Sequence, residues 1–218
     1  MHIFLIRHGE SMANAAIAGG DFDRTVDHLV PLSEHGREQA KEGGEWLKKY
    51  CDDKGIDLGA ARIWRSPFKR TRETAELFNL SLGISDIKED LTLTEQQYGV
   101  FDGLSVEDRE RLYPKECEEY RRLLFNGGKL YARCPMGESP FDVAIRVGQF
   151  IDRIRRDGER EGEKPLFVFT HGCVLRALLL RLLDYSPEWY EAERNPKNCA
   201  IREIKGAVDL GYIHTPGE

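Results

Sequence analysis

Short runs of apolar residues alternate along the chain with longer segments of mixed polarity. The runs are too short for helices and are typical of buried strands; the clearest lie at 3–6, 63–64 and 166–169, and weaker ones at 86–91, 199–204 and 208–213. The segments between them predict helices at 33–50, 66–78, 139–154 and 173–183. Strands that alternate with helices indicate an α/β fold. We expect a three-layer sandwich in which helices cover both faces of a mostly parallel central sheet.

Two segments carry explicit signals of where helices begin and end. Ser66 is a preferred N-cap residue and Pro67 suits the first helical position, so we expect the helix at 66–78 to begin there. A polar helical stretch at 105–125 is broken at Pro114, because proline interrupts a helix. This stretch predicts a small helical cap at about 105–131, inserted in a single domain that spans residues 1–218.

The composition indicates one compact domain without general affinity for polyanions. The chain has 218 residues, of which 40% are hydrophobic, and its 32 basic and 38 acidic residues give a net charge of −6. A broad binder of nucleic acid or of membrane surfaces would show a basic face, so we expect neither partner. This charge balance still allows a small basic pocket.

Neither the N-terminus nor the apolar runs predict export or membrane insertion. The longest strongly apolar stretches, 166–169 and 177–180, are far shorter than the roughly 20 residues that cross a bilayer. The N-terminal run lacks a preceding basic region and is followed by Arg7. Five scattered cysteines, never spaced as CxxC, favour neither disulfides nor a zinc site. We therefore expect a cytoplasmic protein, with Cys173 as a packing residue rather than a reactive thiol.

Charged residues follow three of the predicted strands at the point where each strand ends. The three strand ends read Arg7-His8-Gly9, Arg65-Ser66 with Arg70 one helical turn beyond, and Thr170-His171-Gly172. Ligands of open α/β sheets bind outside the carboxyl ends of the strands, so these side chains predict one cationic pocket. Arginine forks and helix N-termini suit a dianionic phosphoryl group. Each residue alone has an ordinary alternative, a satisfied histidine or an arginine in a surface ion pair. The prediction depends on two His-Gly pairs that each follow an apolar strand.

Several segments extend this pattern in a fixed order along the chain. They are LIRHGES (5–11), RSPFKRTRETA (65–75), LTEQQYGVFDG (93–103), GES (137–139) and THG (170–172). Together they resemble the histidine phosphatase superfamily, the phosphoglycerate mutase-like proteins, from residue 3 to about residue 180. The resemblance also implies one antiparallel strand at the edge of the sheet, formed by the C-terminal segment.

The resemblance and the side-chain chemistry predict a two-step phosphoryl transfer. His8 would attack phosphorus as a neutral imidazole and form a phosphohistidine, while its other ring nitrogen donates to a backbone carbonyl. Arg7, Arg70 and His171 would hold the phosphoryl oxygens, with His171 protonated. Glu95 would be the general acid and then the general base, which requires burial to raise its pKa; the alternative is a surface glutamate in a loop. Because the arginines supply positive charge, we expect no metal ion or other cofactor.

Further residues of the matching segments are expected to contact the phosphate or the substrate: Ser11, Asn14, Arg65, Tyr98, Tyr131, Arg133 and Gly172. Asn14 resembles the asparagine of an extended RHGExxxN motif, and KLYARCPMGES (129–139) is similar to a tract of small phosphatase-like members. Arg65 departs from the family's usual serine, and an outward ion pair is an equal alternative. Arg121 and Arg122 could grip a substrate carboxylate, although a solvated helix face is the favoured interpretation.

The residues after the predicted general acid favour one branch of the family. Mutases carry an arginine just after this glutamate, but Glu95 is followed by Gln96-Gln97-Tyr98-Gly99, and the long Pro-rich insert of mutases is missing. We therefore predict a metal-independent phosphatase that hydrolyses a phosphorylated small molecule. A cofactor-dependent phosphoglycerate mutase is the alternative, and a non-catalytic phosphate-binding module is a third interpretation. The loops at 14–32 and 97–136 are expected to select the substrate, and no pattern specifies an oligomeric state.

Overall fold

A six-stranded sheet forms the centre of the protein in the computed structural model, which describes residues 1–19 and 25–217. Its strands lie in the order β3-β2-β4-β1-β5-β6 and comprise β1 (His2–Arg7), β2 (Arg62–Arg65), β3 (Asp86–Glu89), β4 (Pro165–Thr170), β5 (Ile201–Lys205) and β6 (Val208–His214). The first four strands are parallel, whereas β5 is antiparallel to β1 and β6 is antiparallel to β5. The reversed strand therefore lies one position inside the edge. A tight turn at Gly206, whose φ of 62° suits glycine, lets β6 fold back as the edge strand.

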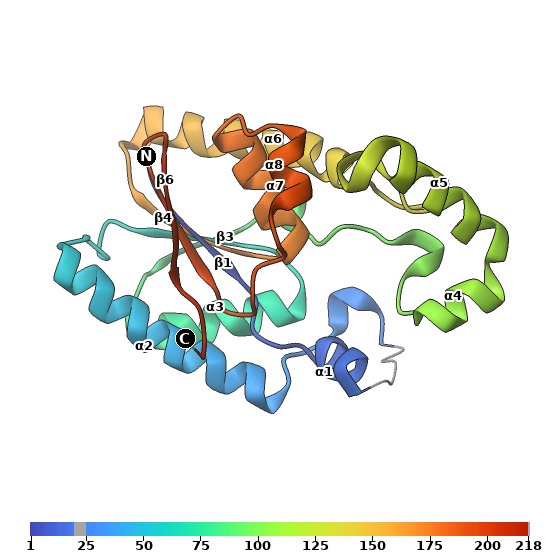
Figure 1. Cartoon of the computed structure of the whole chain (residues 1–218). Helices are drawn as coiled ribbons and strands as arrows, with labels where there is room; N and C mark the ends of the chain where they lie inside the picture. Colours follow the sequence, from blue (N-terminus) through green and yellow to red (C-terminus); the bar gives the residue numbers. More distant parts are fainter. Residues whose placement is uncertain (20–24, 218) are drawn as a thin grey trace.

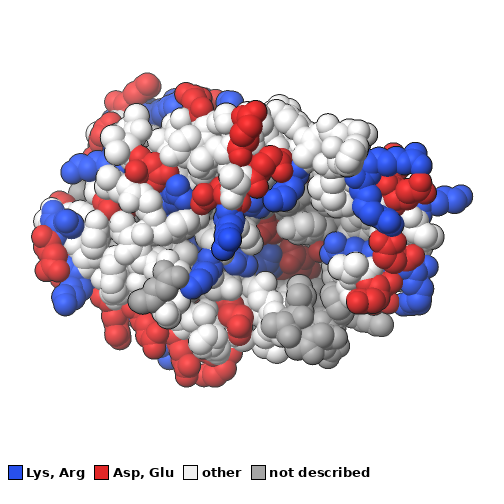
Figure 2. Space-filling model, viewed as in Figure 1, with Lys and Arg blue, Asp and Glu red and all other residues white. Residues whose placement is uncertain are grey.

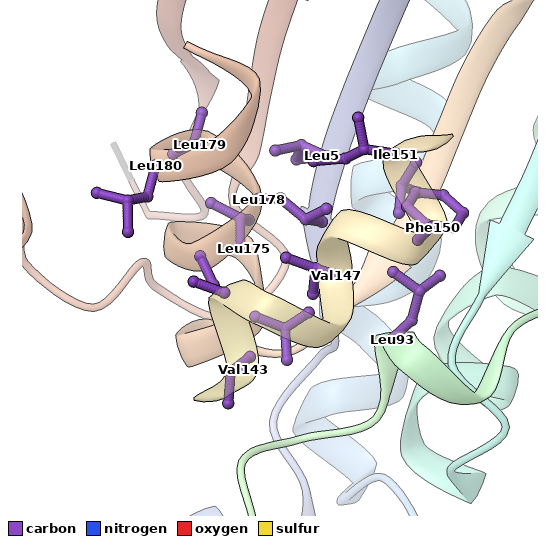
Figure 3. Close-up of a cluster of buried hydrophobic side chains, with 14 of the residues drawn as sticks. Leu5, Leu93, Val143, Val147, Phe150, Ile151, Leu175, Leu178, Leu179 and Leu180 are labelled. Atoms are coloured by element: carbon purple, nitrogen blue, oxygen red, sulfur yellow. The ribbon is translucent and has the colours of Figure 1, made fainter. Parts of the chain in front are cut away.

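Helices cover both faces of this sheet, as the alternating pattern predicts (Figure 1). The helices α2 (Glu34–Lys54) and α3 (Lys69–Leu82) pack on one face, where Phe4, Ile6 and the alternate residues of β2 and β4 join their apolar side chains. The helices α6 (Pro140–Glu161) and α7 (Gly172–Leu182) cover the other face. Figure 3 shows how the apolar side chains of these two helices gather against Leu5 of β1. Neighbouring residues of each buried strand thus enter two separate cores, which makes the fold a three-layer α/β sandwich.

The expected cap segment is helical and is interrupted twice. It contains α4 (Val106–Leu112) and α5 (Pro114–Tyr131), with one break at Tyr113 directly before Pro114 and a kink within α5 at Gly128, whose φ of 74° is not helical. Both lie to one side of the sandwich, on the side toward which the carboxyl end of β1 points (Figure 1). Single turns η2 (Leu91–Leu93) and η3 (Gly99–Phe101) connect β3 to this segment. The helices therefore occupy the expected range, and their role as a cap over the site stays a prediction.

Two further helices were not predicted. The segment at 14–32 was expected to be a loop, but α1 (Met12–Gly19) and the turn η1 (Asp27–Leu29) lie within or beside it; residues 20–24 lie outside the described residues. An eight-residue helix, half of it alanine, shows too few turns for a recognisable period. The helix α8 (Pro187–Ala192) had a usable signal, because Ser186 caps it and Pro187 is its first residue.

One predicted helix start is wrong. The helix α3 begins at Lys69 rather than at Ser66, and Phe68 occupies the N-cap position without a side-chain cap. The Ser66 hydroxyl instead lies 2.9 Å from the ring nitrogen Nε2 of His171. By contrast, Ser139 begins α6 as expected, with a reciprocal capping box to Asp142.

The five cysteines lie in the interior of the protein. Cys51, Cys117, Cys134, Cys173 and Cys199 are all buried free thiols. The Sγ of Cys173 lies 3.4 Å from the hydroxyl of Tyr190, and burial raises the pKa of Cys173 to about 12, so it is a packing residue. Within residues 1–19 and 25–217, no helix is both long and apolar enough to cross a membrane.

Candidate active site

The carboxyl ends of β2, β4 and β1 lie next to one another in the sheet, and this brings the predicted histidines together. The backbone N–H of His8 donates to the Thr170 carbonyl at 3.0 Å, and the N–H of Ser66 donates to the Phe169 carbonyl at the same distance. The centroids of the His8 and His171 rings are 5.2 Å apart. Figure 2 shows a hollow between the body of the protein and the side formed by α4 and α5, with basic and acidic side chains next to each other inside it.

His8 has the protonation state that a nucleophile needs. Its side chain is buried, and its Nδ1 lies 2.7 Å from the carbonyl oxygen of Gly9. A carbonyl only accepts, so Nδ1 carries the proton and the lone pair is left on Nε2. Burial, together with the positive charges of Arg70 and Arg7, holds the pKa of His8 well below its ordinary value. The imidazole is therefore neutral at pH 7, as the proposed attack on phosphorus requires.

The backbone around His8 is fixed from three sides. The N–H of Gly9 donates to Thr74 Oγ1 at 3.0 Å, and a Cβ atom at Gly9 would lie 2.5 Å from the Gly36 carbonyl oxygen. The His8 carbonyl accepts from the Asn198 side chain at 3.0 Å. Glycine is thus required next to His8 because two backbone segments approach too closely for a side chain.

His171 lies at the start of α7 and has no solvent exposure. Its Nε2 lies 2.9 Å from Ser66 Oγ and 3.3 Å from Thr71 Oγ1, while its buried Nδ1 has no hydrogen-bond partner within the part of the chain that the structure describes. Burial and the charge of Arg70 lower the pKa of His171 well below the usual value. Both effects favour the neutral ring in this structure. A bound dianion would raise the pKa of His171, so its protonation beside a phosphoryl group stays a prediction.

Two guanidiniums lie beside these histidines. The Nη1 of Arg7 donates to the Pro196 carbonyl at 2.6 Å, and its Nε is buried without a partner among the described residues. Burial lowers the pKa of Arg7, and the positive charge of Arg70 lowers it further. The side chain of Arg70 is 6% exposed and forms a two-pronged ion pair with Asp27 of η1. The two predicted arginines thus lie on the same side as the histidines, and Arg70 carries an unexpected carboxylate partner; their binding of a phosphoryl group stays a prediction.

Glu95 lies in the loop between η2 and η3, close enough to Arg70 and Arg7 for their charges to affect its pKa. Its Oε1 accepts from the Gln96 N–H at 2.8 Å. Burial raises the pKa of Glu95, against the opposing effects of that N–H and of the charges of Arg70 and Arg7. Sequence reasoning anticipated both the rise and its opposition. The surface-loop alternative for Glu95 is therefore disfavoured.

The residues that hold Glu95 were missed. Arg146 of α6 donates to the Glu95 carbonyl at 3.0 Å and to the Thr92 carbonyl at 2.5 Å. The same guanidinium forms a two-pronged ion pair with Glu138, at 2.8 and 3.0 Å, and Glu138 also accepts from the Gln97 N–H at 3.0 Å. Arg146 therefore fixes the loop of the predicted general acid to the start of α6. Its position seven residues beyond GES carried no signal in the sequence.

Four of the other predicted residues lie near His8, His171 or Glu95. Ser11 Oγ accepts from the Asn14 N–H at 3.1 Å, and Asn14 Oδ1 lies 3.3 Å from the same Asn198 amide that holds the His8 carbonyl. Gly172 begins α7, where a Cβ atom would lie 2.2 Å from the side-chain oxygen of Asn195. Tyr98 is mostly buried beside Glu95, and burial raises its pKa well above the ordinary value. Their contacts with a substrate stay predictions.

The structure places the remaining predicted residues elsewhere. Arg65 pairs with Glu76 at 3.0 Å and with Glu89 at 2.9 Å, so the ion-pair alternative holds. Tyr131 lines a separate surface pocket of about 370 Å³ formed with residues of α6, α7 and α8. Arg133 forms an ion pair with Asp142 at the start of α6. The expectation that these three residues point toward the substrate is therefore not supported by the structure.

The two arginines considered for a substrate carboxylate also have local partners. Arg121 pairs with Glu110 at 2.9 Å, and Arg122 pairs with Glu118 one turn earlier on α5. Their side chains are 60% and 72% exposed, respectively. They form the solvated helix face that was the favoured interpretation. Within the described residues, no group of three or more His, Cys, Asp or Glu side chains could hold a metal ion.

Comparisons with known proteins identify the family of this chain. Residues 3–214 match the family model of the histidine phosphatase superfamily (branch 1). The chain is 32% identical to phosphoglycerate mutase-like protein AT74H of Arabidopsis thaliana, over 93% of this chain and 73% of that protein. It is 31% identical to "Probable phosphoglycerate mutase GpmB" of Escherichia coli, over 94% of this chain and 84% of that protein.

Solved structures of similar fold include two phosphatases. One is a mycobacterial glucosyl-3-phosphoglycerate phosphatase, with a TM-score of 0.71 and 24% identity over 93% of this chain and 88% of that chain. The other is the alpha-ribazole phosphatase from Shigella flexneri, with a TM-score of 0.72 and 23% identity over 94% of this chain and 90% of that chain. At this identity the likeness concerns the fold. With the family model matching nearly the whole chain, the protein belongs to the histidine phosphatase superfamily.

Proposed function

We propose that this protein is a phosphatase that hydrolyses phosphomonoesters through a phosphohistidine intermediate on His8. The observation that carries the proposal is the state of His8: Nδ1 donates to the Gly9 carbonyl, and the buried ring is kept neutral beside two guanidiniums. A neutral imidazole in a cationic pocket suits attack on a dianionic phosphoryl group, because the pocket attracts the anion while the nucleophile retains its lone pair.

In the first step, Nε2 of His8 forms a bond to phosphorus and the bond from phosphorus to the ester oxygen breaks. Arg7 and Arg70 stabilise the charge on the phosphoryl oxygens through this transition state. The departing oxygen takes a proton from the carboxyl group of Glu95. The raised pKa of Glu95 supports this role, because an acid must hold its proton until the transition state is reached.

In the second step, water attacks phosphorus and the bond from phosphorus to Nε2 breaks. The Glu95 carboxylate takes a proton from the water, so the same residue acts as acid and then as base. Inorganic phosphate is released and His8 returns to its neutral form. The two guanidiniums supply the positive charge, so we propose that the reaction requires no metal ion.

Phosphoglycerate mutase is the second candidate, because the sequence relatives carry mutase names. Mutase activity needs a cationic grip on the substrate carboxylate. The two candidate arginines, Arg121 and Arg122, are instead paired with glutamates on an exposed helix face. Gln96 occupies the position after Glu95 at which mutases carry an arginine. Both observations favour the phosphatase.

The test compares wild type with His8→Ala and Glu95→Gln, in the presence of a chelator. Phosphate release is followed with a panel of phosphomonoesters, and formation of 2-phosphoglycerate is followed with 3-phosphoglycerate and 2,3-bisphosphoglycerate. We expect phosphate release by wild type and none by His8→Ala. Isomerisation without release would establish the mutase instead. No turnover by wild type, with or without added Mg²⁺, would establish a phosphate-binding module.

A further inference from the structure

The carboxylate that pairs with the phosphate-binding arginine is the starting point. Asp27 Oδ1 lies 2.8 Å from Nη1 of Arg70, and Oδ2 lies 3.3 Å from Nη2. The Asp27 carbonyl also accepts from Nη1 at 2.7 Å. A carboxylate on a guanidinium fork occupies the donors that a phosphoryl group takes. A phosphomonoester that binds Arg70 through these donors must therefore displace the Asp27 side chain.

Of the two partners, Asp27 is the one that can move. The side chain of Arg70 is 6% exposed, and its guanidinium lies over the Phe68 ring at 5.0 Å, so it stays in place without Asp27. The Asp27 side chain is 34% exposed and comes from a single turn, η1. Rotation about its side-chain bonds takes the carboxylate off Arg70 and leaves it at the rim of the same pocket.

A displaced Asp27 carboxylate faces a charge of its own sign on Asp102, which follows η3. The charge of Asp27 contributes to raising the pKa of Asp102. It also contributes to raising the pKa of Glu95, which in the proposed mechanism holds its proton when the substrate binds and so carries no charge then. Among the described residues, Arg70 is the one cation paired with Asp27, and it is engaged once it holds the phosphoryl group. The rim is therefore acidic, although the floor of the pocket is basic, and Figure 2 shows both signs of charge inside the hollow.

This arrangement has a consequence for the rest of the substrate. An ammonium group on the leaving portion would replace Arg70 as the partner of Asp27, whereas a carboxylate there would add a further negative charge. Two unit charges a few ångströms apart in a half-buried site alter binding by about tenfold or more. The rim therefore discriminates by charge between substrates that the phosphoryl pocket treats alike.

We propose that Asp27 is a specificity-determining residue, which makes the site favour phosphomonoesters whose leaving portion bears an ammonium group over those that bear a carboxylate. This inference rests on the proposed phosphatase function. It commits to a chemical class of substrate, small aminoalkyl phosphates, and it disfavours acidic substrates such as phosphoglycerates.

The test uses three substrates of nearly equal size: 2-aminoethyl phosphate, 2-hydroxyethyl phosphate and phosphoglycolate. Wild type should hydrolyse them with kcat/KM falling in that order, by at least about tenfold between the first and the last. Asp27→Asn keeps the size of the side chain and removes the charge, so it should reduce this ratio to within about threefold. Asp53→Asn, at the exposed far end of α2, is the matched control and should keep the wild-type ratio.

Two outcomes would overturn the inference: equal kcat/KM of wild type for the three substrates, or an unchanged ratio in Asp27→Asn. Failure of the proposed function is distinguishable, because wild type would then hydrolyse none of the three and no p-nitrophenyl phosphate. The inference is still tested in that case by calorimetry. The dissociation constants of the same three compounds for His8→Ala should follow the same order, and Asp27→Asn in that background should remove it.

Discussion

Replacement of Arg146 by lysine should separate positioning of the proposed general acid, Glu95, from support of the fold. The guanidinium makes hydrogen bonds to the Thr92 and Glu95 carbonyls and a two-pronged ion pair with Glu138. The Arg146 and Glu138 side chains are 18% and 19% exposed, so the pair is largely screened from water. A lysine keeps the charge but cannot reach both carbonyls and both carboxylate oxygens at once.

The expected loss of stability follows from the bonds that lysine cannot make. Two or three hydrogen bonds to a charged group disappear from a partly buried site, which should lower the free energy of unfolding by about 2–3 kcal/mol. For a chain of this size the melting temperature should fall by about 4–12 °C. Arg156→Lys, an exposed position on the same helix, should leave the melting temperature unchanged.

The catalytic effect should depend on the leaving group. General acid catalysis contributes about 10²–10⁴-fold, and loosening the acid by an ångström removes about a hundredfold. Arg146→Lys should therefore lose about a hundredfold in kcat/KM with 2-hydroxyethyl phosphate, whose alkoxide needs a proton. With p-nitrophenyl phosphate, whose leaving group is a stable anion, the loss should be less than about fivefold. Both substrates are assayed well below the variant's melting temperature.

Equal losses with both substrates would refute this reasoning, because Arg146 would then support the fold or the nucleophile rather than Glu95. Undiminished activity with the alkyl substrate would refute it as well. Glu138→Gln supplies an independent check: it removes the charge that orients Arg146, so it should show the same leaving-group dependence with a smaller loss.

Three changes test the stability of the fold, and two of them, at Glu95 and Gly9, lie at the candidate site. Because the pKa of Glu95 is raised in the folded protein, Glu95 retains a proton there that the unfolded chain releases. Its contribution to the stability of the fold is therefore lost as pH rises through its folded-state pKa. In urea titrations, Glu95→Gln should be more stable than wild type at about pH 8 but not at about pH 4. Arg62 is buried against Asp157 at 2.9 Å and two further carboxylates, so Arg62→Met should lower the free energy of unfolding in urea by about 3 kcal/mol. Gly9→Ala forces a Cβ against the Gly36 carbonyl, so calorimetry should show a loss of about 2–3 kcal/mol. The absence of any pH dependence in the first, or of any loss in the others, would contradict these assignments.

The residues that could be predicted from the sequence are those that strand geometry brings together. Apolar runs locate β1 and β4, and parallel strands end at the same edge of a sheet. His8 and His171 follow these runs directly, so their meeting needed no knowledge of distant contacts. The hydrogen bond from His8 to a backbone carbonyl could be expected too, since a buried neutral imidazole requires an acceptor for its proton.

The contacts that could not be predicted join side chains from separate elements. Asp27 pairs with Arg70 across 43 positions, and Arg146 reaches the Glu95 loop across 51. No periodicity or motif reports such pairs, because an arginine has the same appearance in a sequence whether its partner is a substrate or a carboxylate. The sequence alone could not distinguish a substrate partner from a carboxylate partner for Arg65 and Arg133. In the structure both pair with acidic residues close to them in the chain.

The His8 intermediate is the central claim, and trapping it tests the claim most directly. Wild type would be mixed with p-nitrophenyl phosphate, quenched in alkali within the first turnover, digested and examined by mass spectrometry, because phosphohistidine survives in base. We expect one phosphorylated peptide, from the N-terminal strand, with the phosphoryl group on Nε2 of His8 and none in His8→Ala. Steady turnover with no phosphate on His8, or with phosphate on another residue, would contradict the account.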